Sequence, residues 1–292
     1  MAAETADLDA APAWFEAALS YAPEHRDVEV EGARVHLRCW GDESRPGVVF
    51  VHGGGAHSGW WDHIAPFLRH THRAVAVDLS GHGDSDHRSA YSTEQWATEV
   101  LVAAAAGGIT GLPYVVGHSM GGFVTAEVGS RSPAVTRGQM IIDSPMDHNP
   151  EESRLRRPRK TYSSEQEICS RFTVTPAQDV LLPYISQHIA SQSVRQSEGS
   201  WVWKFDPQLF DKRSNGDKFS IEDQLPRMQS PTVYLRSEHG MIDDQMAVEI
   251  NTLLGPPLRM IELPDAGHHP MLDQPLALIT AIRMSLTAWA HD

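Results

Sequence analysis

The chain has 292 residues and a mass of 32.3 kDa, enough for one large domain that carries an insertion. Its 24 Lys and Arg against 38 Asp and Glu give a net charge of −14, which argues against nucleic acids and anionic membranes as partners. No run of about 18 apolar residues occurs in it, so no membrane span is predicted.

The distribution of cysteine and histidine gives no metal or redox motif. Cys39 and Cys169 are far apart, and the 16 histidines are scattered along the chain. We therefore expect no metal and no cofactor. The N-terminal residues 1–13 carry acidic groups and no Lys or Arg, unlike a secretory signal, so we expect a cytoplasmic protein. The sequence does not distinguish a monomer from a homodimer.

The first half of the chain predicts strands and helices in alternation. Apolar residues at helical spacing predict a helix over 12–22, and a hairpin follows with strands at 27–30 and 34–40. Further along, buried strands are predicted at 47–51, 73–77, 114–116 and 138–143, and helices at 61–69, after Ser92 to about 106, and from about 120 to 132. This alternation is typical of a parallel sheet with helices on both faces.

From residue 144 to 223 the alternation is interrupted by prolines and short helical pieces. We assign 144–223 to an inserted helical cap, and 1–143 with 224–292 to the core. Aromatic residues Trp201 and Trp203, with Trp60 before the insertion, either wall a substrate pocket or pack the cap down. After the insertion we expect strands at 232–236 and 258–263 and helices at 244–254 and 276–289.

One stretch in the middle of the chain carries the chemistry. A β-branched strand runs into Gly117-His118-Ser119-Met120-Gly121 and then at once into a helix, which is the pattern of a nucleophile elbow. The backbone N–H of Met120 at the helix start is a candidate oxyanion donor, and Gly54 in a glycine loop after a buried strand is a second. The loop before the last helix places His268 at the carboxyl edge of the sheet.

These pieces resemble the α/β-hydrolase superfamily, in its serine-nucleophile type with a cap, over residues 27–292. The resemblance implies a mostly parallel eight-stranded sheet with helices on both faces and an inserted helical cap. It also implies that Ser119 is the nucleophile, that His268 is the general base with His269 a lesser candidate, and that Met120 and Gly54 form the oxyanion hole.

The acid of the triad departs from the family pattern. After the strand at 232–236 the family usually reads Gly-Glu-x-Asp, whereas residues 237–240 read Ser-Glu-His-Gly, so Gly240 occupies the expected acid position. We therefore expect Asp143, at the end of the neighbouring strand, to supply the carboxylate. The alternatives are Asp243, Asp244 and Glu238.

The expected reaction is hydrolysis of a small apolar carboxylic ester or lactone through an acyl-enzyme. Hydrolysis of a carbon–carbon bond, amidase activity and haloperoxidase-like activity use the same triad and remain open. A hydrolase-like receptor with slow or no turnover is the alternative from another class, and Gly240 is the feature that favours it.

Overall fold

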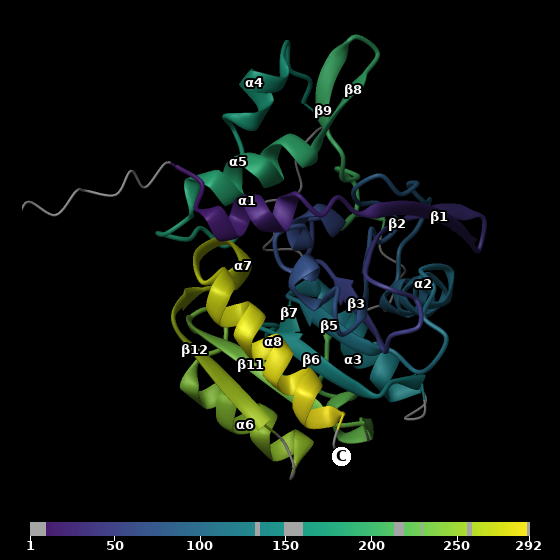
Figure 1. Cartoon of the computed structure of the whole chain (residues 1–292), viewed down its shortest axis with the longest axis vertical. Helices are drawn as coiled ribbons and strands as arrows, with labels where there is room; N and C mark the ends of the chain where they lie inside the picture. The colour runs from purple at the N-terminus through teal and green to yellow at the C-terminus, as the bar shows by residue number, and fades with distance from the viewer. Residues whose placement is uncertain are drawn as a thin grey trace, which may run out of the picture.

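The computed structural model describes residues 10–131, 135–148, 160–212, 219–228, 230–255 and 259–290. Within them, eight strands form one sheet in the order β1-β2-β4-β3-β5-β6-β11-β12 (Figure 1). The strands are β1 (Glu24–Val30), β2 (Ala33–Trp40), β3 (Gly47–Val51), β4 (Arg73–Val77), β5 (Tyr114–His118), β6 (Gly138–Ile142), β11 (Thr232–His239) and β12 (Arg259–Gly267). The predicted eight-stranded sheet is confirmed.

The sheet begins with an antiparallel hairpin and continues in parallel. Strands β1 and β2 are joined by Glu31 and Gly32, which both adopt positive φ as a tight turn requires. Strand β2 also pairs antiparallel with β4, and every later pair is parallel. The carboxyl ends of β3, β5, β6, β11 and β12 therefore share one edge, where a site is expected.

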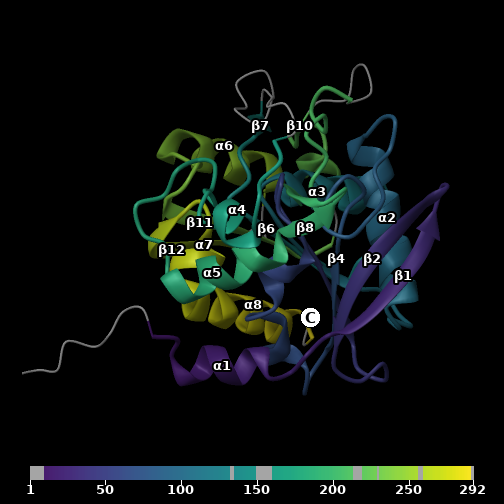
Figure 2. The ribbon, with the colours of Figure 1, turned by 90° about the horizontal axis from the view of Figure 1, so that it is seen from above.

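Helices cover both faces of this sheet, as the side chains of β3 illustrate. Val49 and Val51 belong to one apolar layer, which packs on α2 (Thr93–Ala106), α3 (Met120–Arg131) and α6 (Asp244–Leu254). Val48 and Phe50 point into the other layer, which includes α1 (Ala13–Leu19) and α8 (Pro275–Trp289). Figure 2 shows these two groups of helices on opposite sides of the strands.

The prediction of a single helix at 61–69 is wrong. The structure has two short 3-10 helices there, η1 (Ser58–Trp61) and η2 (Ala65–Leu68). Pro66 lacks the N–H that an α-helix needs and its ring would collide with the carbonyl four residues earlier. The side chain of His57 accepts a hydrogen bond from Gly59 N (3.1 Å), which caps the first piece.

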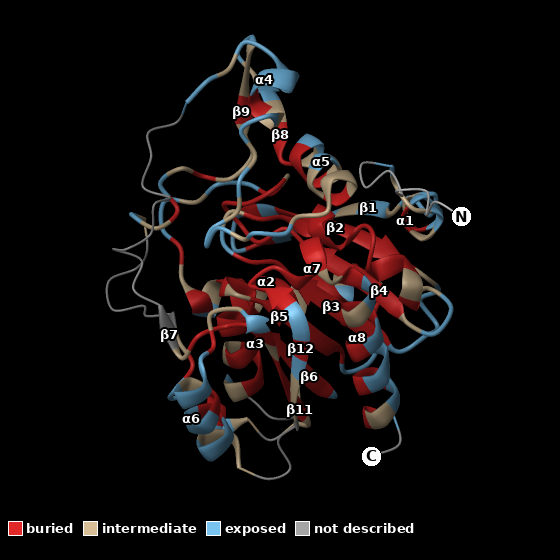
Figure 3. Ribbon diagram, turned by 90° about the vertical axis from the view of Figure 1, so that its left-hand side faces the viewer, coloured by how far each residue is buried: buried red, intermediate tan, exposed pale blue. Residues whose placement is uncertain are grey.

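Between β6 and β11 the described chain forms elements that do not join the sheet. They are β7 (Asp147–His148), α4 (Glu165–Cys169), α5 (Pro183–Gln192), β8 (Val194–Ser197), β9 (Ser200–Trp203), β10 (Phe219–Ser220) and, just before β11, η5 (Leu225–Arg227). Figures 1 and 3 show α4, α5 and the β8–β9 hairpin together at one end of the molecule.

Polar contacts hold α5 against the rest of the chain. Asp62 Oδ2 lies 3.0 Å from His188 Nε2 of α5 and accepts a hydrogen bond of 2.7 Å from Arg38 Nη1. Parts of the 144–223 segment lie outside the described residues, as do residues 1–9 of the N-terminal stretch 1–13 from which a cytoplasmic protein was expected. Among the described helices, none has the length and apolar character that crossing a membrane requires.

Candidate active site

The serine sits on a sharp turn between β5 and α3. Ser119 has a φ of +53° and remains partly exposed, and its N–H donates to Ile142 O (3.0 Å). A Cβ on Gly117 would stand 2.1 Å from the carbonyl oxygen of Gly121, and one on Gly121 would stand 2.5 Å from that of Val51. Only glycine fits at both positions, because strand and helix backbones touch there. The predicted elbow is present.

A buried carboxylate, that of Asp143, directly follows β6. Asp143 is fully buried, and its oxygens accept hydrogen bonds from Ser237 N (3.1 Å) and Met241 N (2.8 Å). A Cβ on Gly240 would stand 2.3 Å from both of these oxygens. The carboxylate therefore occupies the space that a side chain at position 240 would need.

A continuous chain of hydrogen bonds joins these groups through a histidine. His268 Nδ1 lies 2.7 Å from Asp143 Oδ2, and its Nε2 lies 3.0 Å from Ser119 Oγ. His268 follows β12, and its side chain is 3% exposed, so the three groups meet at the carboxyl edge of the sheet. The arrangement has the connectivity of a serine, a base and a carboxylate that orients the base.

The other candidate acids lie elsewhere. Asp243 caps α6 by accepting from Met246 N (2.8 Å), and Asp244 is an exposed partner of Arg236 at 2.7 Å. Glu238 is also exposed and accepts from Asp265 N (2.9 Å). The structure brings none of these three into contact with His268 within the part of the chain that it describes.

The two candidate oxyanion donors are neighbours. Met120 is the first residue of α3, and an added Cβ on Gly54 would lie 3.7 Å from Met120 Sδ and 3.3 Å from Phe210 Cζ. Gly54 itself is exposed. The backbone of Gly54 is thus accessible to a ligand, while Phe210 and Met120 supply apolar surface next to it.

The three tryptophans differ in their relation to this site. Trp60 stacks at a tilt against His269, with ring centroids 5.5 Å apart, and lies 6.2 Å from Phe172. Phe172 in turn lies 6.5 Å from Trp203, so an aromatic row runs from the site into the 144–223 segment. Trp201, on the same strand as Trp203, exchanges backbone hydrogen bonds with Tyr162.

Sequence reasoning missed residues that surround His268. His118 Nε2 lies 2.8 Å from His268 O, and Gln178 Oε1 accepts from His269 N (2.8 Å). Gln178 Nε2 also donates to Asp273 Oδ2 (2.7 Å). The position of His118 inside the Gly-x-Ser-x-Gly pattern was a usable signal, whereas nothing local in the sequence marks Gln178.

Burial governs the protonation of the histidines beside His268. It lowers the pKa of His118 and of His269 well below the usual value, and the other histidines of the group add to the effect. Burial likewise raises the pKa of the Asp273 carboxyl. His118 and His269 are therefore neutral at neutral pH, and His269 has no described contact with Asp143 that would let it replace His268.

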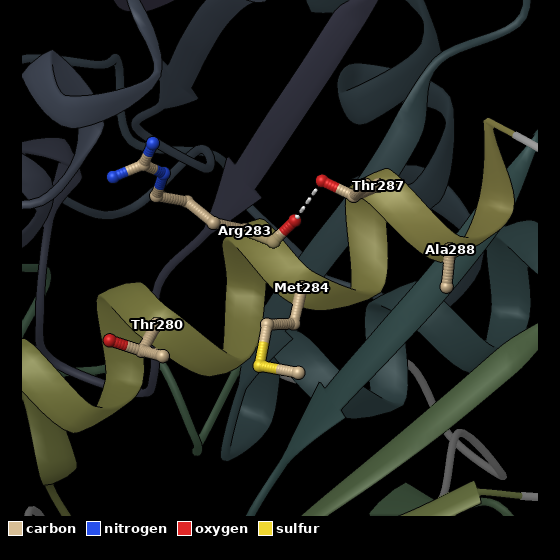
Figure 4. Close-up of a pocket in the computed structure, with 5 residues that line it drawn as sticks. All are labelled: Thr280, Arg283, Met284, Thr287 and Ala288. Carbon is tan, nitrogen blue, oxygen red and sulfur yellow. Dashed lines mark hydrogen bonds between the residues drawn. The ribbon is translucent and has the colours of Figure 1, made fainter.

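A separate depression lies on the outer face of α8 (Figure 4). Its lining comes from one helix, and Thr287 Oγ1 there donates to Arg283 O (2.9 Å). Met284, one of the lining residues, is 67% exposed. This is an open surface feature without a cluster of reactive groups, so the candidate site remains the one at Ser119.

Comparison with known proteins shows which family the chain resembles. The family model described as "Alpha/beta hydrolase family" matches residues 48–281. The esterase Rv0045c of Mycobacterium tuberculosis is 28% identical over 267 residues, 87% of each chain. A pimeloyl-[acyl-carrier protein] methyl ester esterase of Nitrosomonas europaea is 24% identical over 83% of this chain and 96% of its own.

Solved structures share the fold. The crystal structure of the esterase Rv0045c superposes with a TM-score of 0.73 and 22% identity, and covers 98% of this chain and all of that one. E-2-(Acetamidomethylene)succinate hydrolase gives a TM-score of 0.78 with 17% identity over 91% of this chain and 99% of its own. Because the family model spans most of the chain and the observed sheet agrees with it, the chain belongs to the alpha/beta hydrolase family.

Proposed function

We propose that this hydrolase cleaves a small carboxylic ester or lactone, with Ser119 as nucleophile, His268 as general base and Asp143 as the acid. The observation that carries the proposal is the unbroken chain from Ser119 Oγ to His268 Nε2 (3.0 Å) and from His268 Nδ1 to Asp143 Oδ2 (2.7 Å). Relatives named as esterases, at 28% and 24% identity, support an ester as the substrate class.

The reaction follows from the chemistry of these groups. His268 takes the proton of Ser119 as Oγ attacks the carbonyl carbon, and the N–H groups of Met120 and Gly54 receive the oxyanion. The resulting imidazolium is held by Asp143 and returns the proton to the departing alkoxide, which leaves an acyl-enzyme. Water, deprotonated by His268, then attacks the acyl carbon, and the acid is released as Ser119 regains its proton.

The 144–223 segment acts in this proposal as a cap over a core of 1–143 and 224–292. The row formed by Trp60, Phe172 and Trp203 supports an apolar wall for the acyl or alkyl group of the substrate. The alternative of a hydrolase-like receptor was favoured by Gly240 in the expected acid position. That argument loses its force because the Asp143 carboxylate fills the space beside Gly240.

Hydrolysis of p-nitrophenyl esters with acyl chains of two to eight carbons, and of a simple lactone, tests the proposal. We expect Ser119→Ala to reduce the rate to background, and Asp143→Asn to lower kcat by up to about 10⁴-fold because it leaves the base in the wrong tautomer. Asp243→Asn is the matched control, since Asn also caps helices well. Near-full activity of Asp143→Asn would remove that residue from the triad.

A further inference from the structure

Backbone hydrogen bonds tie the turn that carries Ser119 to the end of the neighbouring strand β6. Ser119 N donates to Ile142 O (3.0 Å), and Asp143 N donates to Leu235 O (2.8 Å) on β11. Ser119 and Asp143 both adopt left-handed φ values, +53° and +45°, which cost free energy in a residue that has a Cβ. Two strained residues of the proposed triad thus lie at the ends of adjacent strands, and Ser144 directly follows the second.

The hydroxyl of Ser144 points at the backbone of the serine turn. Its Oγ donates to Ser119 O at 2.8 Å, whereas Ile142 O is 3.4 Å away and already accepts from Ser119 N. Ser144 is fully buried, so bulk water does not compete for this bond. A Cβ on Gly122 would stand 1.8 Å from Ser144 Oγ. The hydroxyl therefore lies in the space that this glycine leaves open.

A second buried hydroxyl holds Ser144 in place. Tyr234 of β11 is fully buried and donates its O–H to Ser144 O. Burial and the nearby charge of Asp143 hold the pKa of Tyr234 well above its usual value, so the phenol keeps its proton. Ser144 is thus fixed from the side of β11, while its own hydroxyl reaches the turn at the end of β5.

The carbonyl that Ser144 contacts belongs to the same peptide unit as the N–H of Met120. That peptide is trans, and in a planar trans peptide the C=O and N–H bonds point in opposite directions. A hydrogen bond to the oxygen therefore fixes the direction of the N–H, and it also polarises the peptide and makes the N–H a better donor. As the first residue of α3, Met120 has no acceptor for its N–H inside the helix.

We propose that Ser144 is a positioning residue, whose hydroxyl holds the Ser119–Met120 peptide so that the Met120 N–H is aimed at the oxyanion. The same carbonyl accepts a second hydrogen bond, from Gly122 N (2.8 Å), but that bond lies within the turn and moves with it. The hydroxyl of Ser144 comes from the end of β6 and so fixes the oxyanion donor relative to Asp143. This role rests on the proposed function, whereas the hydrogen bond itself does not.

Nuclear magnetic resonance tests the hydrogen bond without any turnover. Ser119-Met120 is the only Ser-Met pair in the sequence, so the full chain labelled with ¹³C in the serine carbonyls and ¹⁵N in methionine gives one coupled signal, from this peptide. A hydrogen bond deshields a carbonyl carbon, so Ser144→Ala should move the Ser119 carbonyl resonance upfield. Ser285→Ala is the matched control, because Ser285 is also buried and its Oγ donates to Ala281 O (2.9 Å) on α8. An unchanged Ser119 carbonyl resonance in Ser144→Ala would overturn the proposal.

Kinetics on a p-nitrophenyl ester and on its thiono analogue, in which sulfur replaces the carbonyl oxygen, test the role. Sulfur is a weak hydrogen-bond acceptor, so the oxyanion donors contribute less to hydrolysis of the thiono compound. We expect Ser144→Ala to lower kcat for the ester about tenfold with little change in KM, which is less than the loss of about 10²–10³-fold when a donor is removed outright. For the thiono compound the loss of kcat should stay below about twofold, because little of its rate depends on the donors.

A second variant keeps the test decisive if Ser144→Ala fails to fold. Ser144→Cys fills the site with a thiol, which is a weak donor, and should show the same loss of preference for the ester. An equal fold loss on both substrates, as a displaced Asp143 would give, contradicts the proposal, and so does a Ser144→Cys enzyme with the wild-type ratio of ester to thiono rates. Absence of ester hydrolysis in wild type would instead refute the proposed function and leave the carbonyl resonance as the test of the hydrogen bond.

Discussion

Substitution of Gly240 gives the sharpest test of the proposal that Asp143, and not a residue at the expected position 240, supplies the acid of the triad. In Gly240→Ala the new Cβ would stand 2.3 Å from Asp143 Oδ1 and from Oδ2. Ordinary contact needs about 3.5 Å, so the carboxylate must retreat by about 1 Å. That movement lengthens its bonds to His268 Nδ1, Met241 N and Ser237 N, which are now 2.7, 2.8 and 3.1 Å.

The expected cost is about 10²-fold in kcat, or about 2.7 kcal/mol of transition-state stabilisation, because a displacement of this size misaligns the base. Removal of the carboxylate's orienting role sets the upper limit at about 10⁴-fold. Gly240 does not need a positive φ, so alanine strains no backbone there, and Gly111→Ala is the matched control because nothing lies within 4 Å of its added Cβ. The assay is kcat on a p-nitrophenyl ester together with Tm. A folded Gly240→Ala enzyme with more than half of the wild-type kcat would refute the reasoning.

Two further predictions concern the loop that carries His268 and His269, and the decrease in the free energy of unfolding at acid pH. Gln178→Leu removes the amide that accepts a hydrogen bond from His269 N and donates one to Asp273. We therefore expect kcat to fall about tenfold with a smaller change in KM. Gln166→Leu, on the exposed face of α4, is the control, and an equal effect of that substitution would contradict a positioning role for Gln178. Burial lowers the pKa of His63 from 6.5 to about 4. The unfolded chain therefore binds the proton first, and the free energy of unfolding should fall by up to about 3 kcal/mol from this residue between pH 6.5 and 4. Urea unfolding should show a shallower pH slope for His63→Asn, and an unchanged slope would show that His63 does not contribute.

The sequence alone predicted the sheet and the elbow because both depend on local patterns. The run Val115 to Gly121 combines a buried strand with glycines that the close strand–helix contact requires. Asp143 could be proposed as well, because parallel strands end at one edge and β6 lies next to both β5 and β11. Gly240 also favoured Asp143, because it leaves the expected acid position without a carboxylate.

Other features depend on contacts between distant segments and could not be predicted. Gln178 reaches the loop of His268 from the 144–223 segment across 91 residues of sequence. The clustering of His118 with His269 appears only when β5 and β12 end at the same edge. The prediction of a single helix at 61–69 was wrong because it followed the apolar spacing and disregarded Pro66. Proline lacks the N–H that the interior of an α-helix requires, and the structure has short 3-10 helices instead.

The central claim is that Ser119 carries the acyl group, and a burst experiment tests it most directly. Rapid mixing with a p-nitrophenyl ester should release about one equivalent of p-nitrophenol per chain before steady turnover whenever deacylation is the slower step. Acid quenching followed by peptide mass spectrometry should then place the acyl mass on the peptide that contains Ser119. An acyl adduct on another residue, or turnover that continues in Ser119→Ala, would contradict the account.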